Sequence, residues 1–135
     1  MSCFAYKTKD GISYGKCAVK DDLTPVFKKV EEADAIILGS PIYFGTVSGE
    51  MRSFMERLMF PHLIYTDPPQ SLFPRKIDTG FIYTMNVTEE QMKESVHGQH
   101  LGRNEMVLQM IFGASESLFG FDTYQFEDYS NVVAD

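Results

Sequence analysis

A short run of glycine, proline and aromatic residues constrains the fold more than any other feature of this sequence. Residues 39–45 read Gly-Ser-Pro-Ile-Tyr-Phe-Gly and directly follow the apolar run Ala35–Leu38. A helical pattern begins near Ser48. A strand followed by a Gly/Pro-rich loop and a helix is typical of α/β proteins, in which a parallel sheet carries loops to a ligand crevice.

The residue types in this loop suit a flat ligand with polar edges. Glycine lets the backbone turn sharply and approach a ligand closely. Pro41 fixes its own φ and restricts Ser40, so we expect a stiff loop. Tyr43 and Phe44 add two aromatic faces beside backbone amides. The same pattern is also common as a plain turn after a strand, so the spacing alone leaves both interpretations open.

Composition limits the class of protein and of partner. The chain has 135 residues, with 44% hydrophobic and 23% charged, which predicts a single domain over residues 1–135. A formal net charge of −7 disfavours nucleic acid and anionic membranes, because both attract basic surfaces. No apolar run is long enough to span a bilayer, and no secretion signal opens the sequence. We therefore expect a cytoplasmic protein.

Cysteine and histidine are too sparse to predict a disulfide scaffold or a metal site. The chain has two cysteines, Cys3 and Cys17, which we expect to be reduced thiols. His97 and His100 lie near Glu94, but a metal site needs at least three convergent ligands, and glycines interrupt this stretch. We therefore predict no metal site.

The first half of the chain reads as two helices around the strand at Ala35–Leu38. A helix is expected from Thr24 to about Asp34, with Thr24 as its cap and Pro25 in its first turn. A second helix is expected over Ser48–Met59, capped by Ser48 and ended by Pro61. Apolar residues recur at helical spacing in both.

The second half gives a weaker pattern. Prolines interrupt the stretch from His62 to Lys76, which predicts an irregular connection. The elements expected after it are a strand over Ile77–Tyr83, a loop over Thr84–Val87, a short helix from Glu89 toward Val96 behind the capping box at Thr88, a break at residues 97–102, a helix from Arg103 ended by Gly120, a strand over Phe121–Phe126 and a polar tail.

About three strands therefore alternate with helices. This order predicts an α/β protein with a small parallel sheet and flanking helices. The Pro41 loop and the Thr84–Asn86 loop both follow strands, so they should leave the sheet at the same edge. Two loops converging on one crevice favour the ligand-binding interpretation.

Several segments together resemble one family. Residues 33–45, with Val47, Ser48 and a helix containing Phe54 and Arg57, resemble the NADPH-dependent FMN reductase and iron–sulfur flavoprotein families of the flavodoxin-like superfamily. The resemblance extends to residues 15–22, 82–86 and 122–129. It implies a flavodoxin-like fold that uses FMN, with NADPH or NADH as co-substrate. The implied cofactor-binding residues are Ser40, Pro41, Ile42, Tyr43, Phe44, Gly45, Thr46, Thr84, Met85 and Asn86.

Two departures from the family pattern shape the expectations. The resemblance begins at the cysteine-containing segment Met1–Tyr6, so the first strand, the phosphate loop and the first helix of the family are expected to be missing. A flavin phosphate would then lose its cradle of backbone N–H groups. An iron–sulfur cluster needs four thiolates, and Tyr6 stands where a third cysteine would fall, so we expect no cluster.

The missing strand would also leave Ala35–Leu38 at an edge of the sheet. An apolar edge strand is an association hazard. We therefore expect a homo-oligomer formed through this edge; the N-terminal segment folded back or another protein are the alternatives.

Three functions follow from these features. The first is an FMN-binding NAD(P)H-dependent oxidoreductase, which needs no catalytic side chain because the flavin carries the chemistry. The second is a degenerate flavodoxin-like protein that no longer binds flavin and acts as an interaction or regulatory subunit. The third, a small hydrolase or transferase, is disfavoured because no Gly-x-Ser-x-Gly or Walker motif is present.

Overall fold

A parallel sheet forms the centre of the computed structural model, which describes residues 14–95 and 97–121. Three parallel strands lie in the order β1 (Ala35–Tyr43), β5 (Ile77–Thr84) and β6 (Gly113–Gly120). The two-residue strand β2 (Thr46–Val47) pairs antiparallel with the end of β1, on its other side. The α/β class and the parallel sheet with flanking helices are confirmed, and the strands expected at Ala35–Leu38 and Ile77–Tyr83 lie within β1 and β5.

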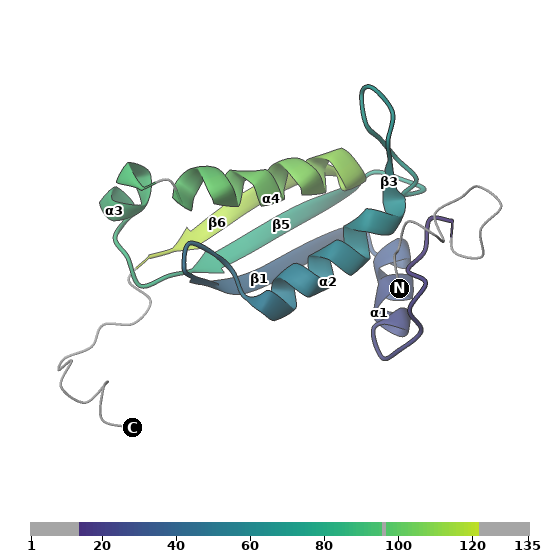
Figure 1. The fold of residues 1–135 in the computed structure, drawn as a ribbon, viewed down its shortest axis with the longest axis horizontal. Coiled ribbons are helices and arrows are strands. Elements are labelled where there is room, and N and C mark those ends of the chain that lie inside the picture. The colour runs from purple at the N-terminus through teal and green to yellow at the C-terminus, as the bar shows by residue number, and fades with distance from the viewer. Residues whose placement is uncertain (1–13, 96, 122–135) are drawn as a thin grey trace.

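Two helices pack along this sheet. Figure 1 shows α2 along β1, and α4 over β5 and β6. The remaining elements are short and lie toward the ends of the sheet. The bounds are α1 Thr24–Glu32, α2 Gly49–Met59, the 3₁₀ helix η2 Phe60–His62, β3 Leu63–Ile64, β4 Gln70–Ser71, α3 Glu89–Glu94 and α4 His97–Phe112.

Side chains alternate between a covered and a bare face of the sheet, as pleated strands require. On β5, Phe81 and Tyr83 are buried, and their rings stack with centroids 4.2 Å apart. Asn104 of α4 donates a hydrogen bond to the Tyr83 hydroxyl over 3.3 Å. The intervening residue Ile82 and its neighbour Leu118 on β6 point to the other face and are exposed. Among the described residues, the core therefore lies on one side of the sheet.

The C-terminal part of the chain differs most from the sequence-based expectation. The predicted break at residues 97–102 is wrong, because α4 begins at His97 and contains both glycines of that stretch. Leu101, within it, is 1% exposed, so packing against the core outweighs the low helix propensity of glycine. The helix ends at Phe112, before Gly113 with its φ of 119°, and not at Gly120.

The last strand is also shifted. Residues 113–120 form β6, where the sequence pattern predicted the end of a helix. Their partnership with β5 supplies backbone hydrogen bonds that the spacing of apolar residues does not reveal. The predicted strand at Phe121–Phe126 is wrong at Phe121, which lies outside β6, and its other residues lie outside the described part of the chain.

The expected loop at residues 39–45 is mostly strand. β1 continues to Tyr43, so only Phe44 and Gly45 turn the chain into β2. Pro41 lies within β1, next to Thr84 of β5. An edge strand tolerates proline because its nitrogen, which lacks hydrogen, can face the open side.

The helix caps divide into confirmed and wrong predictions. Ser48 caps α2 by accepting a hydrogen bond from the Met51 N–H over 3.3 Å, and Thr88 and Gln91 form the predicted capping box on α3. Thr24 does not cap α1. Its hydroxyl accepts from the Asp21 N–H over 3.1 Å, and α1 lacks a side-chain cap.

β1 lies at an edge, as expected. Among the described residues, only β2 borders its outer side, at Ile42 and Tyr43. The connection after α2, expected to be irregular, contains η2 and the small β3–β4 hairpin. Its Phe73 is buried and packs edge-to-face on Phe112 with ring centroids 4.8 Å apart, so it serves the core.

Candidate functional site

The two predicted loops leave the sheet at one edge. Pro41 of β1 is the register partner of Thr84 of β5, and Thr84 is that of Gly120 on β6. Beyond this row, β1 reaches the turn at Phe44, and β5 leads into Met85 and Asn86. Carboxyl ends of parallel strands are where α/β proteins place ligand crevices.

The β1–β2 turn presents aromatic side chains outward. Tyr43 is 60% exposed and Phe44 is fully exposed, so neither is sealed in the core. Tyr43 pairs with Thr46 across the turn, and Phe44 and Gly45 have φ values of 51° and 78°. Positive φ at both central positions is the geometry of a type I′ hairpin turn, which favours asparagine and glycine. A bulky residue such as Phe44 is strained there, and strain of this kind concentrates at functional sites.

Ser40 fixes this hairpin to the start of α2. Its side chain is buried on the covered face, where its hydroxyl accepts a hydrogen bond from the Ser48 N–H over 3.0 Å and donates to the Pro41 carbonyl over 2.8 Å. Ser48 in turn caps α2. The Ser40 hydroxyl therefore links the end of β1 to the start of α2.

The second loop places its three predicted residues differently. Met85 is 4% exposed, and its N–H donates to the Gly120 carbonyl over 3.0 Å. Its side chain therefore belongs to the core. Thr84 and Asn86 are exposed, so they can contact a molecule held against this edge.

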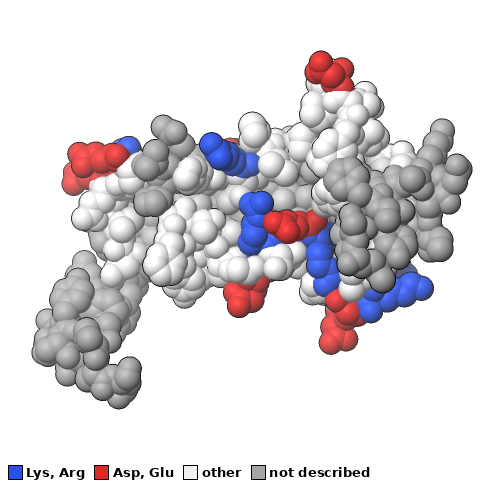
Figure 2. Space-filling view, in the orientation of Figure 1, with Lys and Arg blue, Asp and Glu red and all other residues white. Residues whose placement is uncertain are grey.

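Neither loop carries an ionisable acid or base apart from the Tyr43 phenol. Residues 39–48 and 84–88 contain no lysine, arginine, histidine, aspartate or glutamate. Figure 2 shows uncharged surface where the β1–β2 turn lies, and basic side chains farther toward α1 and the end of α2. Just below the site, burial raises the pKa of Tyr83, which keeps that phenol neutral.

These features fit one part of a flavin better than the other. Exposed rings and backbone amides suit a flat isoalloxazine ring with hydrogen-bonding edges. The phosphate of FMN carries up to two negative charges, and these two loops supply no cation to meet them. The ring therefore fits the described residues, whereas its phosphate lacks an equivalent charged partner there.

Comparison with known families decides the assignment. Residues 3–81, more than half of the chain, match the family model of NADPH-dependent FMN reductase. The chain belongs to this family. The matched stretch includes the β1–β2 turn and ends before Asn86. The position of the second loop beside this turn is therefore supported by the strand register and not by the family match.

Individual relatives match over shorter stretches. An iron–sulfur flavoprotein of Methanocaldococcus jannaschii is 54% identical over 43 residues, which are 32% of this chain and 22% of the relative. An iron–sulfur flavoprotein of Archaeoglobus fulgidus is 44% identical over 48 residues, 36% of this chain and 24% of the relative. The chain thus spans under a quarter of the length of these curated relatives.

Solved structures share the fold. An NAD(P)H:quinone oxidoreductase from Methanothermobacter marburgensis superposes with a TM-score of 0.65 at 11% identity, covering 85% of this chain and 60% of that one. An NADPH-quinone reductase from P. pentosaceus gives a TM-score of 0.62 at 11% identity, with 84% and 70% covered. At such low identity these neighbours show the fold alone.

Within the described residues, no group of three or more His, Cys, Asp or Glu side chains is placed to hold a metal ion. In the same part of the chain, no helix has both the length and the apolar content needed to cross a bilayer.

Sequence reasoning missed two structural contributors to this edge. The bond from Ser48 N–H to Ser40 joins residues eight apart, and no local motif predicts it. The Gly120 carbonyl anchors Met85, but Gly120 was expected to end a helix. Both depend on strand pairing, which local patterns do not specify.

Proposed function

We propose that this chain is an FMN-binding, NAD(P)H-dependent oxidoreductase, with the isoalloxazine ring held between the β1–β2 turn and the Met85–Asn86 loop. Pro41, Ile42, Tyr43, Phe44, Gly45 and Thr46 form one wall, and Thr84 and Asn86 form the other. The family assignment supports the chemistry. The carrying observation is the Pro41–Thr84 register, which puts exposed Tyr43, Phe44 and Asn86 at one edge.

Each part of the chain has a distinct role in this proposal. A bound flavin would supply the hydride chemistry. Tyr43 and Phe44 bind and orient the ring by stacking, Asn86 hydrogen-bonds its polar edge, and Ser40 keeps the turn in place. Met85 contributes by closing the core beneath the second loop.

The proposal also covers the remaining chemistry of the chain. We place the chain in the cytoplasm. We also propose that it holds no [4Fe–4S] cluster, because its two cysteines, Cys3 and Cys17, are fewer than the four thiolates that a cluster needs. Flavin binding is expected to be weakened by the lack of a phosphate partner in the two loops.

Titration with FMN tests the site. Binding should quench flavin fluorescence, and the variants Tyr43→Ala and Phe44→Ala should each weaken it about five- to twentyfold, as expected for loss of a stacking ring. Tyr65→Ala is the matched control, because Tyr65 is exposed to the same extent but lies between β3 and β4. It should leave the affinity unchanged.

The enzymatic part is tested separately. The FMN-loaded chain should oxidise NADPH or NADH with an added acceptor, faster than free FMN at the same concentration. A chain that binds no FMN, or in which Tyr65→Ala costs as much as Tyr43→Ala, contradicts the site. That result would favour the alternative of a flavin-free interaction subunit.

We further propose that two copies associate through the outer edge of β1. Among the described residues, this edge has no strand partner from Ala35 to Pro41, and unpaired strand edges recruit further strands. Light scattering should give the mass of a dimer, and Ile37→Lys should shift it to a monomer. A monomer at all concentrations, with the edge intact, contradicts this proposal.

A further inference from the structure

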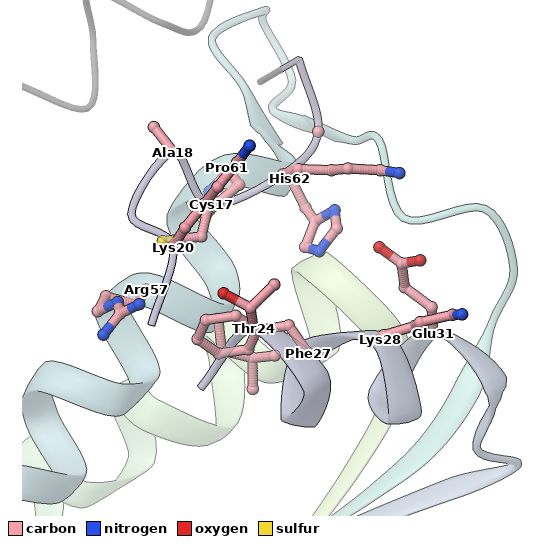
Figure 3. A pocket seen from close by; sticks show the side chains of 13 residues that line it. Cys17, Ala18, Lys20, Thr24, Phe27, Lys28, Glu31, Arg57, Pro61 and His62 are labelled. Atoms are coloured by element: carbon pink, nitrogen blue, oxygen red, sulfur yellow. The ribbon is translucent and has the colours of Figure 1, made fainter. Parts of the chain in front are cut away.

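We propose a second ligand site at the opposite end of the sheet, in a cavity that takes a phosphate monoester with a flat aromatic body. The cavity has a volume of about 550 Å³, in the range of small-molecule sites. It lies between residues 15–20, α1 and the C-terminal end of α2 with η2 (Figure 3). It shares no lining residue with the proposed flavin site.

The charge of the lining is opposite to that of the chain. The whole sequence has 12 basic against 19 acidic residues. The cavity is lined by Lys16, Lys20, Lys28 and Arg57, against one acidic residue, Glu31. A third of the basic residues thus surround one hollow in an acidic protein. A cavity lined by positive charge attracts anions, even in a chain of net charge −7.

Arg57 forms a fixed part of the wall. Its guanidinium donates two hydrogen bonds to the Asp21 carboxylate, over 2.7 and 2.8 Å, and lies 5.4 Å from the Phe27 ring centre. Hydrogen bonds to Asp21 and then to Cys17 raise the pKa of Arg57, so it stays charged. Because Asp21 neutralises it, Arg57 shapes the cavity more than it charges it.

The three lysines are the available charges. The ion pairs found within residues 14–95 and 97–121 involve Arg52, Arg57, Arg75 and Lys93, and leave Lys16, Lys20 and Lys28 unpaired there. Each ammonium has three donors, and their flexible stems can close on one anion from residues 15–20 and from α1. A phosphate monoester, with nearly two charges and three acceptor oxygens, matches such a set.

The floor of the cavity fits the rest of the ligand. Leu58, Pro61 and His62 are buried residues that line it, and Phe27 lines it from α1. The His62 ring packs edge-to-face on Phe73 with centroids 5.1 Å apart, which holds its position. Rigid rings and apolar groups below a cationic rim are suited to a flat aromatic body that carries a phosphate.

Calorimetric titration of the chain with AMP, adenosine and inorganic phosphate tests the site. AMP should bind at least tenfold more tightly than either of the other two, because each of these has only half of the recognised features. Added salt should weaken AMP binding. Adenosine binding as tightly as AMP, or no AMP binding at all, overturns the proposal.

Charge variants localise the binding. The triple variant K16Q/K20Q/K28Q should lose about tenfold or more in AMP affinity, at about two- to fivefold per lysine. K29Q/K76Q/K93Q is the matched control, since it makes the same change in net charge at lysines outside the lining. Thermal melts of both variants show whether they fold. Equal losses in folded variants mean attraction by net charge only and overturn the proposal.

This site is independent of the proposed flavin function. AMP should leave the affinity for riboflavin unchanged, because riboflavin has the isoalloxazine ring without the phosphate and the two sites lie at opposite ends of β1. Displacement of AMP by riboflavin in direct competition would place the isoalloxazine ring and AMP at one site and overturn the inference. The AMP titration uses no flavin, so failure of either proposal is distinguishable from failure of the other.

Discussion

The two faces of the sheet carry similar apolar residues and very different surroundings. On the covered face, Phe81 and Tyr83 are at most 1% exposed beneath α2 and α4. On the bare face, Ile37 is 71% and Leu118 65% exposed, and Ile82 is the partner of Leu118 across the β5–β6 pair. A parallel sheet usually has both faces buried, so the bare face departs from the rule for this class.

The difference shows that strand pairing and helix packing are separable in this chain. β5 is paired on both sides by β1 and β6, although within residues 14–95 and 97–121 helices cover only one of its faces. Stability must therefore come mainly from the covered face, while the bare face keeps the sheet's apolar pattern without its burial. Substitutions on adjacent residues of β5 test this directly.

The largest effect is expected from Phe81→Ala on the covered face. Removing a ring that is 1% exposed and stacked on Tyr83 leaves a cavity, so the free energy of unfolding should fall by about 3–5 kcal/mol. Ile82→Ala, one residue along on the bare face, should cost about 1 kcal/mol or less. Urea denaturation measures both. Equal losses would mean that the bare face is buried in solution, by a second copy or another segment.

Ser40→Ala should have the next largest effect. The variant leaves the Ser48 N–H without its acceptor in a part-buried position, at a cost of about 1–3 kcal/mol. FMN affinity should fall with it, because the turn loses its attachment to α2. Ser53→Ala, on the exposed side of α2, is the control and should change stability by less than about 0.5 kcal/mol. If Ser40→Ala leaves the free energy of unfolding and the FMN affinity unchanged, the Ser40–Ser48 hydrogen bond does not hold the turn.

The sequence predicted elements whose signals are local. The Ser48 cap, the Thr88 capping box and the β1 strand each depend on neighbouring residues, and the structure contains all three. The boundary between α4 and β6 was wrong because one helix was expected from Arg103 to Gly120, whereas residues 113–120 pair with β5.

The candidate site was predictable in part for the same reason. The order of strands and loops predicted that the Pro41 and Thr84 segments meet, and the register confirms it. The inward position of Met85 was not predictable, because it depends on the Gly120 carbonyl of a strand that the pattern misplaced. The grouping of the cavity lysines was not predictable from the sequence, because they come from two segments and no motif joins them.

A smaller effect, of opposite sign, is expected from Phe44→Asn in the turn above the sheet. Asparagine tolerates the φ of 51° and precedes Gly45, which completes the preferred type I′ pair. The free energy of unfolding should rise by about 0.5–1 kcal/mol, while FMN affinity falls because the ring is lost. Chemical denaturation and FMN titration of the same sample measure the two. A variant that loses stability would show that Phe44 packs in the fold rather than serving a ligand.

The smallest effect concerns the ion pair that joins residues 14–23 to the covered side of the molecule. The hydrogen bond from Arg57 lowers the pKa of the Asp21 carboxyl below its ordinary 3.8. A lowered carboxyl pKa stabilises the fold at pH values above 3.8, and this contribution is lost as the pH falls through the folded-state value. Asp21→Asn should therefore melt slightly lower than the parent at pH 7, and the difference should disappear in acid.

Asp22→Asn provides the comparison that isolates this pair. Asp22 is an exposed neighbour with the same charge, and the ion pairs of the described residues do not include it. Its melting temperature should track the parent across the same acid range. If Asp22→Asn reproduces the acid behaviour of Asp21→Asn, the effect comes from net charge, because both variants remove one negative charge. If only Asp21→Asn changes, the Arg57 pair holds the segment before α1 against α2.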